Sequence, residues 1–156
     1  MKVFIFILLF CFAANAQSSD ELRQKYGAPT SETYTETYQA RPYNEKTKLS
    51  VGVTVTYTKN KEICQILVDL FPYFVGVDIP TTKEEDELKS QLLREVVNEV
   101  LSSGKRGRHI INGFVSGSCS EDGCFGTFER YEKVTIFYNG NNHRYARISF
   151  KEVACK

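Results

Sequence analysis

The sequence predicts an α+β fold in which an antiparallel sheet of about six strands packs on one long helix. Three features support this prediction. One strongly helical segment lies mid-chain, the segments on both sides alternate apolar and polar residues, and short polar turns separate them. Because strands joined by short turns pair antiparallel, we expect the element order α-β-β-β-α-β-β-β. The two halves share this order without residue identity, so an internal duplication is only a suggestion.

The central helix is expected over Thr82–Leu101. Leucine and valine recur at helical spacing from Leu88 onward, and Thr82 with Glu85 forms a capping box. At 100° per residue the apolar side chains cover about 220° of the helix, more than the ~100° stripe of a surface helix. We therefore expect a buried spine that is covered by a curved sheet, by the Phe71–Phe74 loop or by the first helix.

The segment Met1–Ala16 has the features of a cleaved export signal. Lys2 is a short positive region, Val3–Ala14 is an apolar stretch, and the chain then reads Ala-Asn-Ala before Gln17. The apolar stretch is shorter than the ~18–20 residues that a membrane span needs. We expect cleavage after Ala16 and a single domain over residues 17–156 in a secreted or periplasmic location.

Composition and charge exclude several classes of protein. A chain of 156 residues is long enough to bury one core, and its aromatic content and balanced charge are untypical of a disordered chain. Without the leader and its Lys2, the chain carries nineteen basic and nineteen acidic side chains. A nearly neutral domain is not steered to polyanions, so we expect no nucleic-acid partner and no membrane insertion after cleavage.

The first half is expected to hold one short helix and three strands, at Ser18–Tyr26, Thr33–Tyr38, Val51–Tyr57 and Cys64–Leu70. Gly27 and Pro29 end the helix, and Lys59–Lys61 is a hairpin turn. The strand at Thr33–Tyr38 is expected at a sheet edge. The polar segment Ala40–Lys48 contains Pro42 and is expected to be a loop.

The second half is expected to hold three strands, at Arg108–Val115, Phe128–Tyr138 and Tyr145–Val153. A cysteine-containing loop spans Gly117–Gly126, and Asn139–Asn142 is the strongest turn signal in the chain. Polar side chains share one face of the sheet, which we expect to be open to solvent while the helix covers the other: Thr54, Thr56, Gln65 and Asp69.

Four cysteines remain after removal of the leader, and an even number in an oxidising compartment favours disulfides. Cys119 and Cys124 flank a short loop and form the most plausible local pair. Cys64 with Cys155 would then join a central strand to the C-terminal end. A buried thiol at Cys64 is the alternative.

Catalysis has weak support in the sequence. Cys119 or Ser116 with His109 could form a nucleophile and a base, but no residue supplies the third group of a triad. The segment Gly113–Gly117 places its serine one position too late for a nucleophile elbow. The plain interpretation is that His109 starts a strand and that His143 lies in a turn, both in contact with water.

The support in the sequence for a metal site is equally weak. Cys119, Cys124 and a histidine would make a zinc site, but a second ligand pair is missing and export favours oxidation of the thiols. Glu121 and Asp122 do not fit the calcium-loop pattern. We therefore expect no metal and no cofactor.

Two groups of residues are candidates for binding. Lys105, Arg106 and Arg108 form a dense basic cluster that suits an anion, although cations after a helix end also complement the helix dipole. Tyr34 and Tyr38 lie on one side of the predicted edge strand, where aromatic rings suit a protein or glycan partner. The alternative is that these rings belong to the core.

Short motifs in this order resemble an uncharacterised family of secreted bacterial α+β proteins: Lys25–Pro29, Glu32–Tyr34, Val53–Tyr57, Cys64, Lys105–Gly107 and Tyr131–Ile136. The resemblance covers most of the mature chain and implies no known activity, substrate or catalytic residue. The chain is more loosely similar to small outer-membrane assembly lipoproteins, but it lacks their lipid-attachment site.

The first functional hypothesis is an exported, non-catalytic domain that binds a protein or polymer through the edge at Thr33–Tyr38 and nearby aromatic loops. The alternative is a small secreted hydrolase or thiol enzyme that uses Cys119, Ser116 or His109.

Overall fold

The computed structural model describes residues 19–29, 31–32, 34–71, 82–115, 126–140 and 144–155. The predicted leader and the predicted cysteine loop lie outside these residues. The described elements, in chain order, are α1 Ser19–Tyr26, β1 Ser31–Glu32, β2 Thr35–Asn44, β3 Leu49–Tyr57, β4 Ile63–Phe71, α2 Lys83–Val100, α3 Ser103–Arg106, β5 His109–Val115, β6 Gly126–Tyr131, β7 Val134–Asn139 and β8 Tyr145–Phe150.

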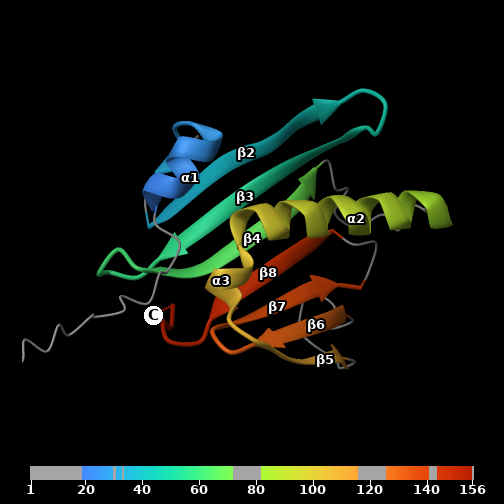
Figure 1. Cartoon of the computed structure of the whole chain (residues 1–156). Coiled ribbons are helices and arrows are strands. Elements are labelled where there is room, and N and C mark those ends of the chain that lie inside the picture. The colour runs from blue at the N-terminus through green and yellow to red at the C-terminus, as the bar shows by residue number, and fades with distance from the viewer. Residues whose placement is uncertain are drawn as a thin grey trace, which may run out of the picture.

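These strands form one antiparallel sheet with the order β1-β2-β3-β4-β8-β7-β6-β5. The sheet consists of an N-terminal meander (β1–β4) and a C-terminal meander (β5–β8), and their last strands, β4 and β8, pair with each other (Figure 1). The predicted α+β class and antiparallel pairing are confirmed. The predicted number of about six strands is wrong, because the described residues form seven strands of six residues or more and the two-residue β1.

One of the additional strands comes from a turn that the sequence does not signal. The predicted strand Phe128–Tyr138 is a hairpin, β6 and β7, that turns at Glu132 and Lys133. Neither residue is a typical turn former. Tertiary hydrogen bonds hold the turn instead, since the Lys133 N–H donates to the Arg106 carbonyl at 3.1 Å and the Lys133 carbonyl accepts from Lys151 N–H at 3.0 Å.

The other difference lies in β2, which continues to Asn44 through the predicted loop. Pro42 fits here for two reasons. The pairing of β2 with β3 is irregular around Arg41, and β1 covers β2 only at Glu36 and Thr37. Proline has no N–H to donate, so it is tolerated at an irregular strand edge.

The predicted central helix is present as α2, and its capping box is confirmed. The Thr82 hydroxyl accepts from the Glu85 N–H at 3.2 Å, and the Glu85 carboxylate accepts from the Thr82 N–H at 3.0 Å. The prediction that the sheet packs on one long helix is confirmed only in part. The described part of the chain has three helices, and Leu22 of α1 is completely buried in the same core as α2.

The core lies between the sheet and the helices, on what we call the helix face. Alternate residues of the central strands point into it, as the predicted alternation requires. Its side chains come from both meanders and from α2: Val51, Val53, Val55, Ile66, Val68, Leu93, Val96, Val97, Val100, Val134, Ile136, Ala146 and Ile148.

A disulfide joins Cys64 to Cys155, with Cα atoms 5.3 Å apart and a sequence separation of 91. This predicted pair is present, and the alternative of a free Cys64 thiol is wrong. The bond ties the segment after β8 to the start of β4, so it closes the junction between the two meanders. Cys119 and Cys124 lie outside the described residues.

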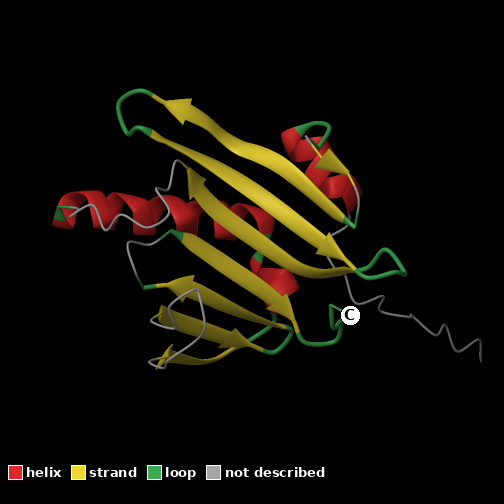
Figure 2. Ribbon diagram, turned by 180° about the vertical axis from the view of Figure 1, so that it is seen from behind, coloured by secondary structure: helices red, strands yellow, loops and turns green. Residues whose placement is uncertain are grey.

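The opposite side of the sheet, the open face, carries no helix among the described elements (Figure 2). Thr54, Thr56, Gln65 and Asp69 lie there and are partly exposed, as expected. Within the described residues, no helix is both long and apolar enough to cross a membrane.

Candidate functional site

Tyr34 and Tyr38, which were predicted to share one accessible side of an edge strand, do not form one surface. Tyr34 is 68% exposed just before β2, whereas Tyr38 is 1% exposed and lies in the core. The prediction that both rings line an accessible edge is therefore wrong for Tyr38. The reason is tertiary: α1 packs over this part of β2 and buries the side that Tyr38 occupies.

Tyr38 belongs to a buried network around Glu36, which is 8% exposed. The Arg23 guanidinium of α1 donates to one carboxylate oxygen of Glu36 at 2.6 Å, and the Tyr38 hydroxyl donates to the other at 2.6 Å. The Tyr57 hydroxyl donates to the same second oxygen. A buried carboxylate is stable only with such partners, so this network fixes α1 to the sheet.

The basic cluster also has structural roles. Lys105 forms an ion pair with Glu21 of α1. Arg106 donates to the Leu101 carbonyl at 2.9 Å, where the end of α2 leaves carbonyl groups without helical partners. Arg108 is 82% exposed and pairs with Glu132 at 3.1 Å. The three cations therefore point to different partners instead of forming one anion site.

The described residues of the enzymatic alternative form no catalytic arrangement. His109 is exposed, one ring nitrogen lies 2.7 Å from the Asn112 side-chain oxygen, and its ring meets Tyr131 edge-on. Within the described residues, no carboxylate hydrogen-bonds to this histidine. Ser116, Cys119 and His143 lie outside the described residues, and no group of metal-ligating side chains occurs within them.

The two edges of the sheet differ strongly in character. The β5 edge exposes Ile110 at 53%, Ile111 at 51% and Phe114 at 64%, and the strand has no charged residue. The pairing of β5 with β6 is irregular between His109 and Ile111 but regular from Ile111 to Val115. An exposed, uncharged, apolar edge strand is a template for pairing with another chain.

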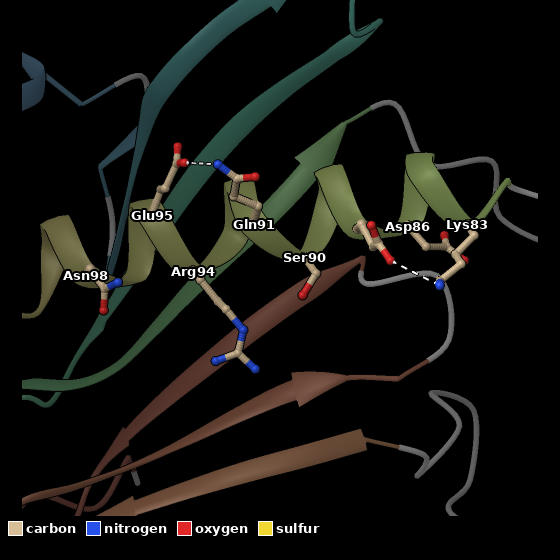
Figure 3. Close-up of a pocket in the computed structure, with 8 residues that line it drawn as sticks. Lys83, Asp86, Ser90, Gln91, Arg94, Glu95 and Asn98 are labelled. Atoms are coloured by element: carbon tan, nitrogen blue, oxygen red, sulfur yellow. Dashed lines mark hydrogen bonds and ion pairs between the residues drawn. The ribbon is translucent and has the colours of Figure 1, made fainter.

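A hollow of about 730 Å³ lies along the polar flank of α2 (Figure 3). Arg94 points from this flank toward the C-terminal meander, where its guanidinium pairs with Glu129 of β6 at 2.6 Å and lies 4.4 Å from the Tyr138 ring centroid. Its described lining residues are of polar or charged types and all come from α2: Lys83, Asp86, Glu87, Ser90, Gln91, Arg94, Glu95 and Asn98.

Two groups of the sheet, one in each meander, have pKa values that are raised by burial. Burial, assisted by the nearby Glu129 carboxylate, raises the pKa of Tyr138 to about 12, so this phenol stays protonated. On the open face, burial raises the pKa of Asp69 to about 6 although Arg147 opposes the shift. Neither group faces a nucleophile or a second catalytic group among the described residues.

Comparison with known proteins adds no functional information. No protein-family model and no curated protein matches the chain. The chain is similar to a solved DUF4309 family protein (YjgB) from Bacillus subtilis subsp. subtilis str. 168, with 12% identity over 88% of this chain and 80% of that chain, at a TM-score of 0.42. A similarity at that level carries no argument. The resemblance to a secreted bacterial family stays a prediction.

Sequence reasoning overlooked β5 as the accessible edge. The sequence predicts an ordinary strand over Arg108–Val115 and assigns the edge to Thr33–Tyr38. One signal was present, because Ile110 and Ile111 are adjacent and no charged residue follows before Val115. An uncharged strand with apolar residues on both faces is either central and buried or an unprotected edge.

Proposed function

We propose that this chain is an exported, non-catalytic binding domain that captures an extended segment of a protein partner by adding it as a strand to β5. The observation that carries this proposal is the exposed apolar edge formed by Ile110, Ile111 and Phe114. Strand addition uses the unpaired backbone groups of an edge for affinity and alternate side chains for specificity.

The register of the sheet defines what the partner strand would meet. Asn112 and Phe114 lie opposite Glu129 and Thr127 of β6. Because Glu129 contacts α2, these two residues of β5 are on the helix face. Ile111 is on the open face. Apolar side chains of the added strand would therefore pack beside Phe114 on one face and beside Ile111 on the other.

The opposite edge of the sheet is a poor competitor for this role. The edge of β2 is partly covered by β1, contains Pro42, and is irregular on both sides of Arg41. Irregular pairing, proline and charge are the features by which proteins protect an edge from pairing. The first hypothesis from the sequence is thus retained, but its binding edge moves from Thr33–Tyr38 to β5.

Export is part of the proposal. It is supported by the leader-like segment Met1–Ala16 and by the Cys64–Cys155 disulfide, since such bonds persist in oxidising compartments. Near-neutral charge supports a partner recognised by shape and backbone pairing more than by long-range attraction.

A displayed library of random twelve-residue peptides tests the proposal on the native, oxidised protein. We expect selection of peptides that alternate apolar residues and that slow hydrogen exchange of the β5 backbone amides. The double substitution Ile111→Lys/Phe114→Lys should weaken binding at least tenfold, because lysine at both faces opposes apolar packing.

Tyr43→Lys is the matched control, since Tyr43 is an apolar residue, 50% exposed, near the opposite edge. Its affinity for the selected peptides should equal that of the unmodified protein. Equal binding by the β5 double variant, or failure to select any peptide, would overturn the proposal.

A further inference from the structure

The open face carries a continuous row of short hydroxyl and amide side chains. Each member lies directly opposite the next across a strand pair, so the row crosses five strands from β2 to β7. Its members are Thr35, Thr56, Gln65, Ser149 and Thr135. Adjacent strands lie about 4.8 Å apart, so the row is about 19 Å long and perpendicular to the strands.

A second row runs beside the first at an offset of two residues, toward higher numbers in one strand and lower numbers in the next. It becomes apolar toward β6, and its members are Thr37, Thr54, Leu67, Arg147, Phe137 and Phe128. At its polar end, the hydroxyl oxygens of Thr37 and Thr54 are 3.3 Å apart and hydrogen-bond to each other. One row therefore supplies hydrogen-bonding groups, and the other supplies an apolar strip at Leu67, Phe137 and Phe128, which Arg147 interrupts.

Two glycines keep the aromatic end of the strip close to the sheet. A Cβ atom on Gly113 would lie 2.2 Å from the Phe128 ring, and one on Gly126 would lie 2.5 Å from the Phe137 ring. The two rings thus lie over backbone that has no side chain. Because the two rings lie over glycine backbone, this part of the surface is flatter than it would be with upright rings. Aromatic rings cover glycines in other sheets in the same way.

We propose that the two rows bind an extended, neutral, β-linked polysaccharide whose chain crosses the strands. Hydroxyl and amide groups both donate and accept hydrogen bonds, which matches the hydroxyl groups of a sugar. The apolar strip matches the carbon–hydrogen face of a pyranose ring. Since strand spacing is close to the length of one pyranose unit in an extended chain, successive side chains of the row meet successive sugars.

The charges nearby favour a neutral polymer. The hydroxyl row carries no charge from β2 to β7, and the two cations nearest the rows, Arg147 of the second row and Arg130 opposite Thr135, each have a neighbour. Arg147 lies next to Asp69, and Arg130 lies over the Phe128 ring at 5.5 Å. An extended peptide is disfavoured here because the interior strands already pair on both sides, which leaves no backbone edge for strand addition.

The two rows contain none of the exposed apolar side chains of β5, so the inference does not depend on the proposed function, although the Phe128 ring lies against Gly113 of β5. Figure 2 shows the face that carries the rows, and the described helices lie behind the sheet in that view. A protein with both surfaces would bind a polypeptide at its edge and a polysaccharide on its face.

Native electrophoresis of the oxidised protein in gels containing hydroxyethyl cellulose, xylan, dextran or alginate tests the inference. We expect retardation by the β-linked neutral polymers, cellulose derivative and xylan, and none by flexible dextran or anionic alginate. Cellohexaose should shift the NMR methyl signals of Thr54 and Thr56.

Truncation of the row by Gln65→Ala/Ser149→Ala should weaken retardation at least tenfold. The matched control, Ser90→Ala/Gln91→Ala, removes the same groups from the flank of α2 and should leave it unchanged. Retardation by alginate alone, equal loss in both double variants, or absence of methyl shifts would overturn the inference. Methyl shifts caused by the peptides selected at β5, without any polysaccharide binding, would also overturn it.

Discussion

The two meanders occupy equivalent places in the sheet, yet they are covered and bounded differently. The N-terminal meander is covered by the eight-residue α1, whose Leu22 is fully buried, and by α2. The C-terminal meander has the four-residue α3 in the matching position of the chain, and its outermost strand, β5, exposes three large apolar side chains. The same sheet therefore has one protected end and one accessible end.

Polar contacts increase this difference. In the N-terminal half, α1 is attached through Arg23 to Glu36, and Lys25 and Arg41 both pair with Glu99 of α2. In the C-terminal half, the contact of α2 with β6 rests on Arg94 and Glu129. The difference fits the proposed function, in which the N-terminal meander is the scaffold and the C-terminal meander provides the edge for binding.

The largest expected effect comes from separating the two halves at their junction. Replacing the disulfide, by Cys64→Ala/Cys155→Ala, releases a loop of 91 residues and should lower the free energy of unfolding by about 2–4 kcal/mol. Urea unfolding measures this loss, and hydrogen exchange should show the β4–β8 pair opening earlier. The reduced unmodified protein is the control. An unchanged urea midpoint of the double variant would contradict the stabilising role of the disulfide.

The next effect distinguishes the polar networks of the two halves. Glu36→Ala removes the acceptor of two phenol groups and one guanidinium in a buried site, so stability should fall by about 2–3 kcal/mol. Glu129→Ala, the counterpart in the C-terminal half, breaks a more exposed pair and should cost below about 1 kcal/mol. Thermal unfolding of both variants tests this, and equal losses would remove the contrast between scaffold and binding half.

A pH-dependent effect is expected at the junction on the open face. Burial raises the pKa of Asp69 from 3.8 to about 6, so the folded state favours the protonated acid and loses stability as pH rises through this range. Asp69→Asn keeps the neutral form at every pH. With allowance for solvent screening, it should stabilise the protein by about 1 kcal/mol at pH 7.5 and leave stability unchanged at pH 4. Denaturation at both pH values checks the sign, and destabilisation at pH 7.5 would contradict it.

The smallest effect on stability is expected where the largest effect on binding is proposed. Phe114→Lys changes a side chain that is 64% exposed and should alter stability by at most about 0.5 kcal/mol. Tyr43→Lys near the other edge should behave likewise, but only Phe114→Lys should reduce self-association at high concentration, because a charge protects an apolar edge. Light scattering and thermal unfolding separate the two effects. A large stability loss would show that Phe114 is a structural residue.

Sequence reasoning was most successful where structure is local. The capping box places the start of α2 at Lys83, and alternation correctly separates the helix face from the open face at Val51–Tyr57. It failed at the hairpin turn of Glu132 and Lys133, and at Pro42 in β2. In both cases contacts distant in sequence, or the absence of a neighbouring strand, decided the outcome.

By itself, the sequence determined the elements whose signal is contained in a few turns of helix or a few residues of strand, because capping and side-chain alternation are short-range effects. It also predicted Cys64 with Cys155, although as one of several pairings. Only the tertiary structure decided that Tyr38 is buried and that β5 lies at the exposed edge. Strand order and helix docking make these decisions, since the same alternating strand is buried or accessible according to what packs against it.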